Sequence, residues 1–209
     1  MWVPVSFTFF VLMFQISYSF IEDRHPHIVI KKGIKERSKI RSSMITTVVI
    51  NFVSSLLWVP VYHTVRTTYP PPETTPLGFL VRVPLIVVLS DVVFYLLHIT
   101  FHKIPALYRY HHIHHMYVHP HAITALQCHW LEMVLVNVPY FMIPLLVAKV
   151  SYQYTVFYCF IAMASTVYSH SGLNFGVGST FHHIHHLKRN GNYGDGLFMD
   201  KLFKTEIVD

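Results

Sequence analysis

Five apolar stretches divide the chain, and each is about as long as a helix that crosses a membrane. They cover residues 2–21, 44–62, 78–97, 130–148 and 152–169. The hydrocarbon core of a bilayer requires roughly 20 apolar residues per crossing helix. The pattern therefore predicts an all-α fold, an integral membrane helical bundle in which a short polar turn joins the last two helices as a hairpin. A hydrophobic fraction of 53% and a charged fraction of only 12% favour the same class.

The first apolar stretch has two interpretations, a cleaved signal peptide and a retained anchor helix. No Lys or Arg precedes residues 2–21, and no small-residue cleavage site follows them. A signal peptide normally has both features. We therefore expect an anchor helix, and a count of five crossings places the N-terminus on the side opposite the cytosol.

Basic side chains concentrate between the first two stretches. They are Arg24, Lys31, Lys32, Lys35, Arg37, Lys39 and Arg41. Cytosolic loops of membrane proteins are enriched in Lys and Arg, so residues 22–43 are predicted to face the cytosol. Alternating crossings then place the Pro-rich stretch 66–78 on the far side and return the segments from His98 and from His170 to the cytosol. The net charge of +6 is thus explained by a membrane-flanking loop rather than by nucleic-acid binding.

Most of the 17 histidines lie in two regions, residues 98–129 and 170–186. In "HITFH" (98–102) two histidines are four positions apart. In "HHIHH" (111–115), and again in "HHIHH" (182–186), three histidines stand at positions i, i+3 and i+4. Residues at these separations share a helix face. The sequence therefore predicts a cytosolic histidine-rich helical cap at one membrane surface.

Metal binding explains these histidines better than a set of solvated rings does. Unpaired rings near apolar surface are costly to bury, whereas neutral imidazole is a common metal ligand. One ion takes four to six ligands, so eight rings imply two metals. Cys128 and Cys159 form no CxxC pair, which argues against iron–sulfur and Cys-rich zinc sites.

Two other metal motifs do not fit. The Glu-x-x-His at Glu22–His25 lies far from the histidine clusters, unlike the paired motifs of soluble di-iron bundles, and no His-Glu-x-x-His occurs. Spacing alone leaves iron and zinc open. A nitrogen-rich pair of redox-active ions at a membrane surface favours oxygen chemistry on a lipid.

The three histidine boxes, taken in order, resemble the fatty acid hydroxylase/sterol desaturase superfamily of membrane-bound di-iron oxidases. Further similar segments are "LYRYHHIHH" (107–115), "QCHWLE" (127–132), "SHSGLNF" (169–175) and "GNYGDGLFMDKLFKT" (191–205). The resemblance covers about residues 88–205. The eight residues between His102 and His111 favour the hydroxylase/sterol group over acyl-CoA desaturases, and the last two segments look closest to the sterol C4-methyl oxidase and cholesterol 25-hydroxylase branch.

This resemblance implies a set of iron ligands. They are His98, His102, His111, His114, His115, His182, His185 and His186. His170 of "SHSG" is implied as a ninth ligand and His129 of "CHWLE" as a tenth. Fatty-acid 2-hydroxylases carry a further histidine at the position of Thr166, so its absence argues against that activity. The resemblance also divides the chain into N-terminal membrane helices with a basic cytosolic loop (1–75) and a fatty acid hydroxylase-like catalytic domain (76–209).

The few carboxylates near the boxes are expected to orient the ligand rings, as carboxylates commonly do in metal sites. Asp91 lies on the helix face of His98, inside an apolar helix, where it either orients a box ligand or packs against Arg82. Glu132 lies one turn from His129 and serves likewise. Asp195 and Asp200 are interpreted as structural groups that fix the Gly-rich loop and the tail.

The remaining histidines are expected to have other roles. They are His112 and His183 at variable box positions, His119 and His121 beside the second box, and the solvated His25, His27 and His63.

The resemblance implies an enzyme that uses O2 and external electrons to hydroxylate or desaturate a lipid C–H bond, with a sterol as the leading substrate. "GVGSTF" (176–181) lacks the nucleotide-binding spacing, so reducing equivalents must come from partners. The resemblance implies that these partners are cytochrome b5 and its reductase, with NAD(P)H as the electron source. The implied location is the endoplasmic reticulum with the boxes facing the cytosol. The alternatives are a fatty acid or alkylglycerol hydroxylase, a non-enzymatic metal-handling membrane protein, and a catalytically silent relative.

Overall fold

The computed structural model describes residues 3–25, 37–173, 179–196 and 198–208. Its elements are α1 (Val3–Arg24), α2 (Arg37–Thr68), α3 (Pro76–Lys103), α4 (Pro105–His111), η2 (His114–Met116), η3 (Ala122–Thr124), α5 (Trp130–Glu132), η4 (Met133–Asn137), α6 (Val138–Val147), α7 (Tyr152–Ser171), α8 (Ser179–Lys188) and α9 (Met199–Leu202). Within these ranges every element is helical, which confirms the predicted all-α class.

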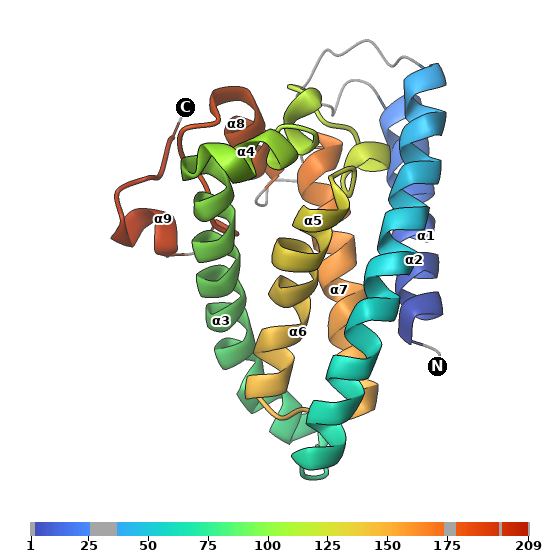
Figure 1. Ribbon diagram of the computed structural model, residues 1–209, viewed down its shortest axis with the longest axis vertical. Coiled ribbons are helices and arrows are strands. Elements are labelled where there is room, and N and C mark those ends of the chain that lie inside the picture. The colour runs from blue at the N-terminus through green and yellow to red at the C-terminus, as the bar shows by residue number, and fades with distance from the viewer. Residues whose placement is uncertain (1–2, 26–36, 174–178, 197, 209) are drawn as a thin grey trace.

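The long helices form a bundle whose members run up and down, and the short elements cap one of its ends (Figure 1). Helices α1, α2, α3 and α7, together with the continuous run α5–η4–α6, extend along the bundle. The cap consists of α4, α8 and the short turns after α4. All three histidine boxes lie at this end, where α1 ends and α2 begins, whereas the N-terminus lies toward the opposite end. The predicted gathering of the boxes at one end of the bundle is therefore confirmed.

Three helical segments are long and apolar enough to cross a membrane: Ile45–Thr68, Pro76–Lys103 and Trp130–Val147. They correspond to the second, third and fourth predicted spans. Apolar side chains such as Phe52 and Leu56 of α2 are about half exposed, as expected for a surface that faces lipid. The first and fifth predicted spans form α1 and α7. These two are not among the three segments, so their crossing of the membrane stays a prediction.

Proline and threonine set the limits of α3. Thr75 caps its start, where its hydroxyl accepts a hydrogen bond from the Gly78 N–H at 3.0 Å, and Pro76 occupies the first turn. Pro105 cannot continue the helix, because it has no N–H and disfavours a helical residue before it. The chain therefore breaks after Lys103 and turns into α4. This break leaves the first box in the last two turns of α3, facing the cap.

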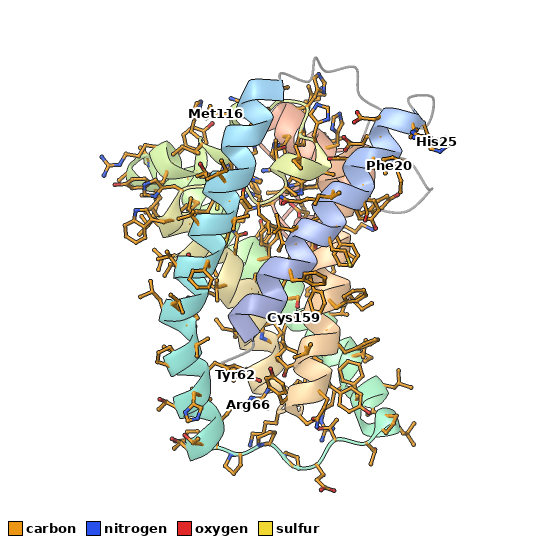
Figure 2. All side chains as sticks on the ribbon, turned by 90° about the vertical axis from the view of Figure 1, so that its right-hand side faces the viewer. Phe20, His25, Tyr62, Arg66, Met116 and Cys159 are labelled. Carbon is orange, nitrogen blue, oxygen red and sulfur yellow. The ribbon has the colours of Figure 1, made fainter. Side chains whose placement is uncertain are left out.

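Helix α1 belongs to the same packed unit as the helices that carry the boxes. Phe10 and Phe14 contact the ring of Phe160 on α7 at centroid distances of 5.1 and 5.0 Å. The buried Gln15 donates a hydrogen bond to the Ile123 carbonyl at 3.1 Å. Figure 2 shows α1 and α2 crossing the same face of the bundle, with Phe20 and His25 near the cap. The division at residue 75 thus runs through a shared core, and as a domain boundary it stays a prediction.

Candidate metal centre

Nine buried or half-buried histidines converge in the cap in two groups. The five-ring group consists of His98, His102, His111, His115 and His185, and the four-ring group consists of His114, His170, His182 and His186. Within each group the candidate ligand nitrogens lie within 4.8 Å of one another. The eight predicted box histidines and His170 therefore meet in space, although up to 88 residues separate them along the chain.

The second and third boxes each supply both groups, which the sequence interpretation did not anticipate. Helix α4 ends at His111, and a short 3₁₀ turn carries His114 and His115. The prediction that the second box forms one face of a continuous helix is therefore wrong. On α8 the i, i+3 and i+4 positions fan out over about 100°, because each residue turns the helix by about 100°. His182 and His186 therefore face the four-ring group, whereas His185 faces the five-ring group.

Backbone carbonyls fix the orientation of the rings. In the five-ring group, Nδ1 of His98 lies 2.7 Å from the Tyr193 carbonyl and Nδ1 of His185 lies 2.7 Å from the Gly191 carbonyl. In the four-ring group the corresponding acceptors are the carbonyls of Gln127 for His114 (3.1 Å), Thr166 for His170 (2.8 Å) and Tyr117 for His186 (3.2 Å). A carbonyl can only accept, so each of these rings carries its proton on Nδ1. Each Nε2 is then left with a lone pair.

These lone pairs face one another. Nε2 of His114 lies 3.3 Å from Nε2 of His170, and both rings hold their proton on the opposite nitrogen. Two lone pairs at this distance cannot form a hydrogen bond and repel each other. A cation between them converts the repulsion into coordination. Among the described residues, the buried Nε2 of His186 also has no hydrogen-bond partner, which is consistent with a metal-ligand nitrogen.

The protonation states suit a metal as well. Burial lowers the pKa of His111 and of His185 to about 3, and it lowers the pKa of His186 well below its ordinary value of 6.5. These rings are therefore neutral at physiological pH, which is the form that binds metal. The residues present thus fit two metal ions with nitrogen ligands.

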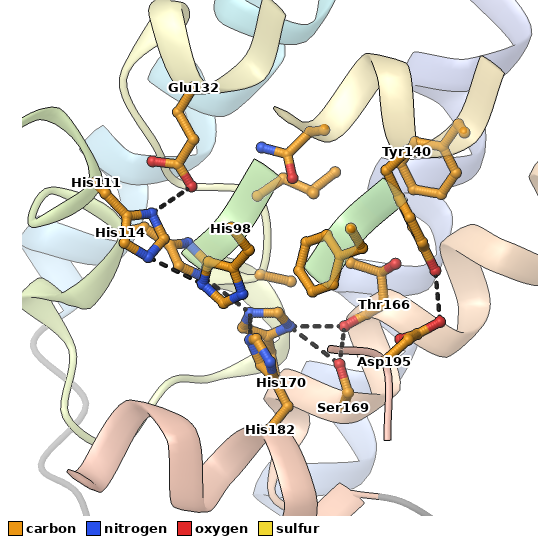
Figure 3. Close-up of a pocket in the computed structure, with 15 residues that line it drawn as sticks. His98, His111, His114, Glu132, Tyr140, Thr166, Ser169, His170, His182 and Asp195 are labelled. Carbon is orange, nitrogen blue, oxygen red and sulfur yellow. Dashed lines mark hydrogen bonds and ion pairs between the residues drawn. The ribbon is translucent and has the colours of Figure 1, made fainter. Parts of the chain in front are cut away.

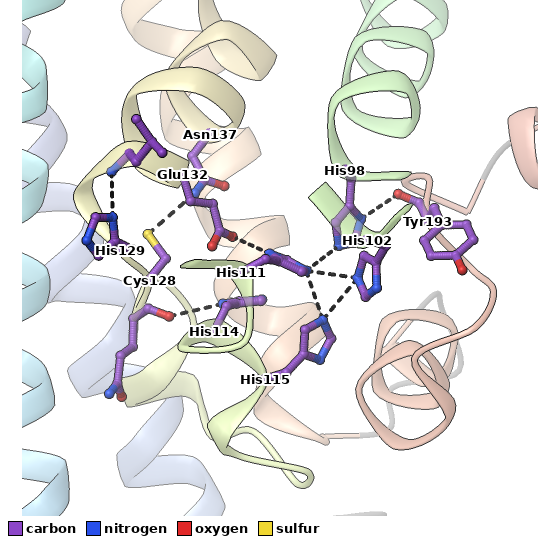
Figure 4. A network of polar contacts seen from close by, with 12 residues as sticks. His98, His102, His111, His114, His115, Cys128, His129, Glu132, Asn137 and Tyr193 are labelled. Atoms are coloured by element: carbon purple, nitrogen blue, oxygen red, sulfur yellow. Dashed lines mark hydrogen bonds and ion pairs between the residues drawn. The ribbon is translucent and has the colours of Figure 1, made fainter. Parts of the chain in front are cut away.

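Two of the predicted carboxylates influence the orientation of the rings. Glu132 contacts a ring directly, whereas Asp91 acts through the C-terminal loop. Oε1 of the buried Glu132 lies 2.9 Å from Nδ1 of His111 (Figure 4), as expected for a carboxylate that orients a ligand ring. Asp91 neither contacts a ligand ring nor packs against Arg82, the two roles that were expected for it. Its carboxylate accepts hydrogen bonds from the backbone N–H groups of Asp195 (2.9 Å), Phe198 (3.0 Å) and Met199 (2.9 Å). It therefore holds the C-terminal loop, while Arg82 bonds to the Gly78 carbonyl of its own helix.

Asp200 has the structural role that the sequence predicted. It accepts hydrogen bonds from the N–H groups of Tyr193 (2.8 Å) and Gly194 (2.6 Å), and from the Thr205 hydroxyl (2.6 Å). Gly194 is necessary here, because a Cβ would lie 2.8 Å from carboxylate oxygens of both Asp91 and Asp200. The two aspartates thus close the loop that presents the Gly191 and Tyr193 carbonyls to the five-ring group.

The other histidines of the described residues lie outside both groups. Nδ1 of His129 accepts the Leu131 N–H at 3.2 Å and caps α5, so this arrangement does not support its role as a tenth ligand. His119 stacks on His183 with a centroid distance of 5.4 Å, and Nδ1 of His121 lies 3.2 Å from Glu22. This placement agrees with the prediction that His119, His121 and His183 are not metal ligands. His112, His25 and His63 are exposed, and His27 lies outside the described residues.

A small cavity adjoins both ring groups (Figure 3). Its volume is about 40 Å³, enough for a few small molecules the size of water. Rings of both groups line it, as do apolar side chains that include Phe94 and Phe141. Tyr140, Asn137 and Asp195 add polar groups to its wall. The sequence interpretation had not assigned Tyr140 or Asn137 to the site, because neither belongs to a recognisable motif.

Comparisons with known proteins agree with this geometry. The profile of the family described as fatty acid hydroxylase matches residues 83–205. Fatty acid hydroxylase ahd1 of Mycosarcoma maydis is 32% identical over 167 residues, which cover 76% of this chain and 42% of that protein. The chain thus spans less than half the length of this relative, and no solved structure matches it. With three boxes, their convergence and a family match over more than half of its residues, the chain belongs to the fatty acid hydroxylase family.

Proposed function

We propose that this membrane hydroxylase is a di-iron oxidase that uses O2 and external electrons to hydroxylate a C–H bond of a lipid. The single observation that carries the proposal is the pair of ring groups that share one cavity. Nine imidazole rings in groups of five and four suit two redox-active ions. The fatty acid hydroxylase family supports a lipid substrate.

The proposed ligands are the nine rings of the two groups, without His129. Two iron ions bound there would supply the oxidant for an unactivated C–H bond. The chain's own part is to position the reactants. Phe94 and Phe141 present an apolar wall that holds hydrocarbon and keeps bulk water away. Glu132 contacts Nδ1 of His111 at 2.9 Å and so orients this ring, whose Nε2 faces Nε2 of His102 at 2.9 Å.

Electrons have to come from a partner protein. We propose NAD(P)H as their source and cytochrome b5 with its reductase as the carriers. The end of α1 at Arg24 and the start of α2 at Arg37 lie at the same end of the bundle as the cap (Figure 1), and in the sequence they stand within the basic stretch 22–43. The bias of Lys and Arg toward cytosolic loops supports a cap that faces the cytosol, in the endoplasmic reticulum membrane.

A sterol is the leading substrate, and a fatty acid or an alkylglycerol is the alternative. The "SHSGLNF" and C-terminal segments support the sterol branch. The name of the relative from Mycosarcoma maydis supports the fatty acid branch. A metal-handling role without catalysis is less well supported, because the elements that carry the two ring groups meet at one end of the bundle (Figure 1).

The test combines metal analysis with lipid analysis. The purified chain is expected to contain two iron ions, and its expression in cells is expected to create an oxidised lipid whose formation requires O2 and a reductant. The His114→Ala variant removes one ligand of the four-ring group and should lose that product. His112→Gln, at an exposed neighbouring position, is the matched control and should retain it. Identical lipid profiles with and without the wild-type chain would contradict the enzymatic proposal.

A further inference from the structure

The C-terminal arm, residues 198–208, lies against one of the three helices that are long and apolar enough to cross the membrane. Its short helix α9 begins where the Met199 N–H donates to the Asp91 carboxylate of α3 at 2.9 Å. The ring of Phe203 stacks on that of Tyr95, one turn further along α3, with a centroid distance of 5.2 Å. Figure 1 shows α9 beside α3. The arm is therefore fixed at the level of these two residues of α3.

The depth of Asp91 and Tyr95 in the membrane does not depend on the exact limits of the span. The apolar segment Pro76–Lys103 has 28 residues, whereas the hydrocarbon core requires roughly 20. Every stretch of that shorter length within the segment includes residues 84–95. Asp91 and Tyr95 therefore lie at membrane depth, and so does the part of the C-terminal arm that is bound to them.

The arm presents apolar side chains at this depth. Leu202 is 65% exposed and Phe203 is 55% exposed, although α9 packs on α3. Large exposed apolar groups are unfavourable in water and favourable in lipid. Lys201 is exposed as well, and its long aliphatic chain lets its ammonium group reach the lipid headgroups. Apolar side chains next to cationic ones are typical of segments that lie in the membrane interface.

The backbone of the arm has polar partners within the protein, as lipid requires. The Thr205 N–H donates to the Asp200 carbonyl at 2.8 Å, and the Thr205 carbonyl accepts the Asn192 N–H at 2.9 Å. The side chain of Asn192 accepts the Ile207 N–H at 2.6 Å and donates to the Ile207 carbonyl at 3.0 Å. Irregular backbone is tolerated at membrane depth where the protein supplies such partners. This arrangement allows a non-helical segment to rest against lipid.

We propose that the C-terminal arm is an interfacial membrane element, which rests in the leaflet next to the cap with Leu202 and Phe203 against acyl chains and Lys201 among the headgroups. The sequence predicted a cytosolic position for this segment. The partner is the lipid bilayer, and the inference does not depend on the proposed chemistry. The arm continues from the loop that presents the Gly191 and Tyr193 carbonyls, so one side of the five-ring group is supported at the membrane surface.

Spin labelling measures the surroundings of the arm directly. A nitroxide is attached to Leu202→Cys in the full chain, which is reconstituted in nanodiscs of palmitoyl-oleoyl phosphatidylcholine. Cys128 and Cys159 are buried, and the signal of wild-type chain treated in the same way is subtracted. Power-saturation EPR compares collisions of the label with O2, which concentrates among acyl chains, and with a water-soluble nickel chelate. The ratio of the two collision rates rises with depth in the bilayer.

Two matched positions define the scale of this measurement. Leu85→Cys lies within residues 84–95 of α3 at a side chain that is 45% exposed, so its label should report lipid. Lys188→Cys lies at an exposed position of α8 in the cap, so its label should report water. The ratio at Leu202 should exceed that at Lys188 and approach that at Leu85. As a second measurement, brominated acyl chains should quench the added fluorescence of Leu202→Trp and should leave that of Lys188→Trp unchanged.

Either of two results would overturn the inference. A ratio at Leu202 equal to that at Lys188, or an unquenched Leu202→Trp, would place the arm in water. Exclusion of both collision reagents would show that a second copy or another protein covers the arm. Lipid oxidation is measured by its own product, so failure of this inference and failure of the proposed function are distinguishable.

Discussion

The five-ring and four-ring groups use the same chemistry but depend on different supports. The five-ring group is oriented by carbonyls of the C-terminal loop, which Asp91 and Asp200 hold, and by Glu132. The four-ring group is oriented by carbonyls of residues 117, 127 and 166. The carbonyl of Gln127 follows the turn η3, and α1 holds this turn through hydrogen bonds of Gln15 and Glu22. Two adjacent ring groups in one cap thus rely on opposite ends of the chain.

Because the two groups have different supports, a helix outside the residues that match the family can affect one of them. Oε1 of Glu22, near the end of α1, accepts the Ala122 N–H at 2.9 Å, and Oε2 lies 3.2 Å from His121. The segment continues to Gln127, whose carbonyl accepts the Nδ1 proton of His114. The family profile begins at residue 83. Helix α1 therefore supports the four-ring group, although it carries no motif of the family.

The strongest test of this comparison is the substitution Asp91→Asn. The amide cannot accept all three backbone N–H groups, so the loop shifts and the carbonyls that orient His98 and His185 move with it. Loss of such orienting groups commonly lowers metal affinity by about 10- to 100-fold. We expect the iron content to fall from two ions toward one, with the remaining ion in the four-ring group. Iron analysis with Mössbauer spectroscopy of the 57Fe-loaded protein measures both.

The control for this experiment is Glu73→Gln, an exposed carboxylate in the loop between α2 and α3. It should retain both ions. Equal loss of iron from the two groups in Asp91→Asn would show that the C-terminal loop supports the whole cap and that the two supports are not separate.

A smaller effect, on the other group, is expected for Glu22→Ala. The substitution leaves the buried Ala122 N–H without its acceptor, at a cost of about 1–3 kcal/mol. The segment that leads to Gln127 loosens, and the four-ring group should bind its ion several-fold more weakly. Titration of the metal-free protein with ferrous iron measures the two affinities.

Glu22→Gln is the matched variant, because the amide oxygen can still accept the Ala122 N–H. It should bind iron nearly as the wild type does. If Glu22→Ala weakens the five-ring group instead, then α1 does not support the four-ring group in the way inferred here.

The smallest difference between the two groups is expected in their response to acid, because burial keeps the rings of both groups neutral. The pKa of His111 and of His185 is about 3 in the folded chain, below the ordinary 6.5 of an exposed histidine. Between these values the unfolded chain binds protons that the folded chain does not, so folded stability falls as the pH falls from about 6.5 toward 3. The metal-free protein should melt at a lower temperature at pH 5 than at pH 7.5, as measured by calorimetry in detergent. Bound iron should raise the melting temperature at both pH values, and equal melting temperatures of the metal-free protein would contradict the neutral state of the rings.

Local features of the sequence predicted the helices and most of the proposed ligands. The second, third and fourth apolar stretches correspond to the three spans, and the boxes identified eight of the nine rings, with His170 supplied by "SHSG". The division of the rings between two groups could not be predicted. It depends on where α4 ends and on how His182 and His185 diverge on α8. The role of Asp91 was also missed, because its partners are backbone N–H groups more than 100 residues away.

By itself, the sequence determined a helical membrane protein with histidines gathered at one end, because hydrophobic length and the spacing of histidines are local properties of the chain. Only the tertiary structure decided which ring belongs to which group, which carbonyl orients it, and that Tyr140 and Asp195 stand together at the cavity. These facts depend on contacts between residues that lie tens of positions apart, and no local pattern encodes such contacts.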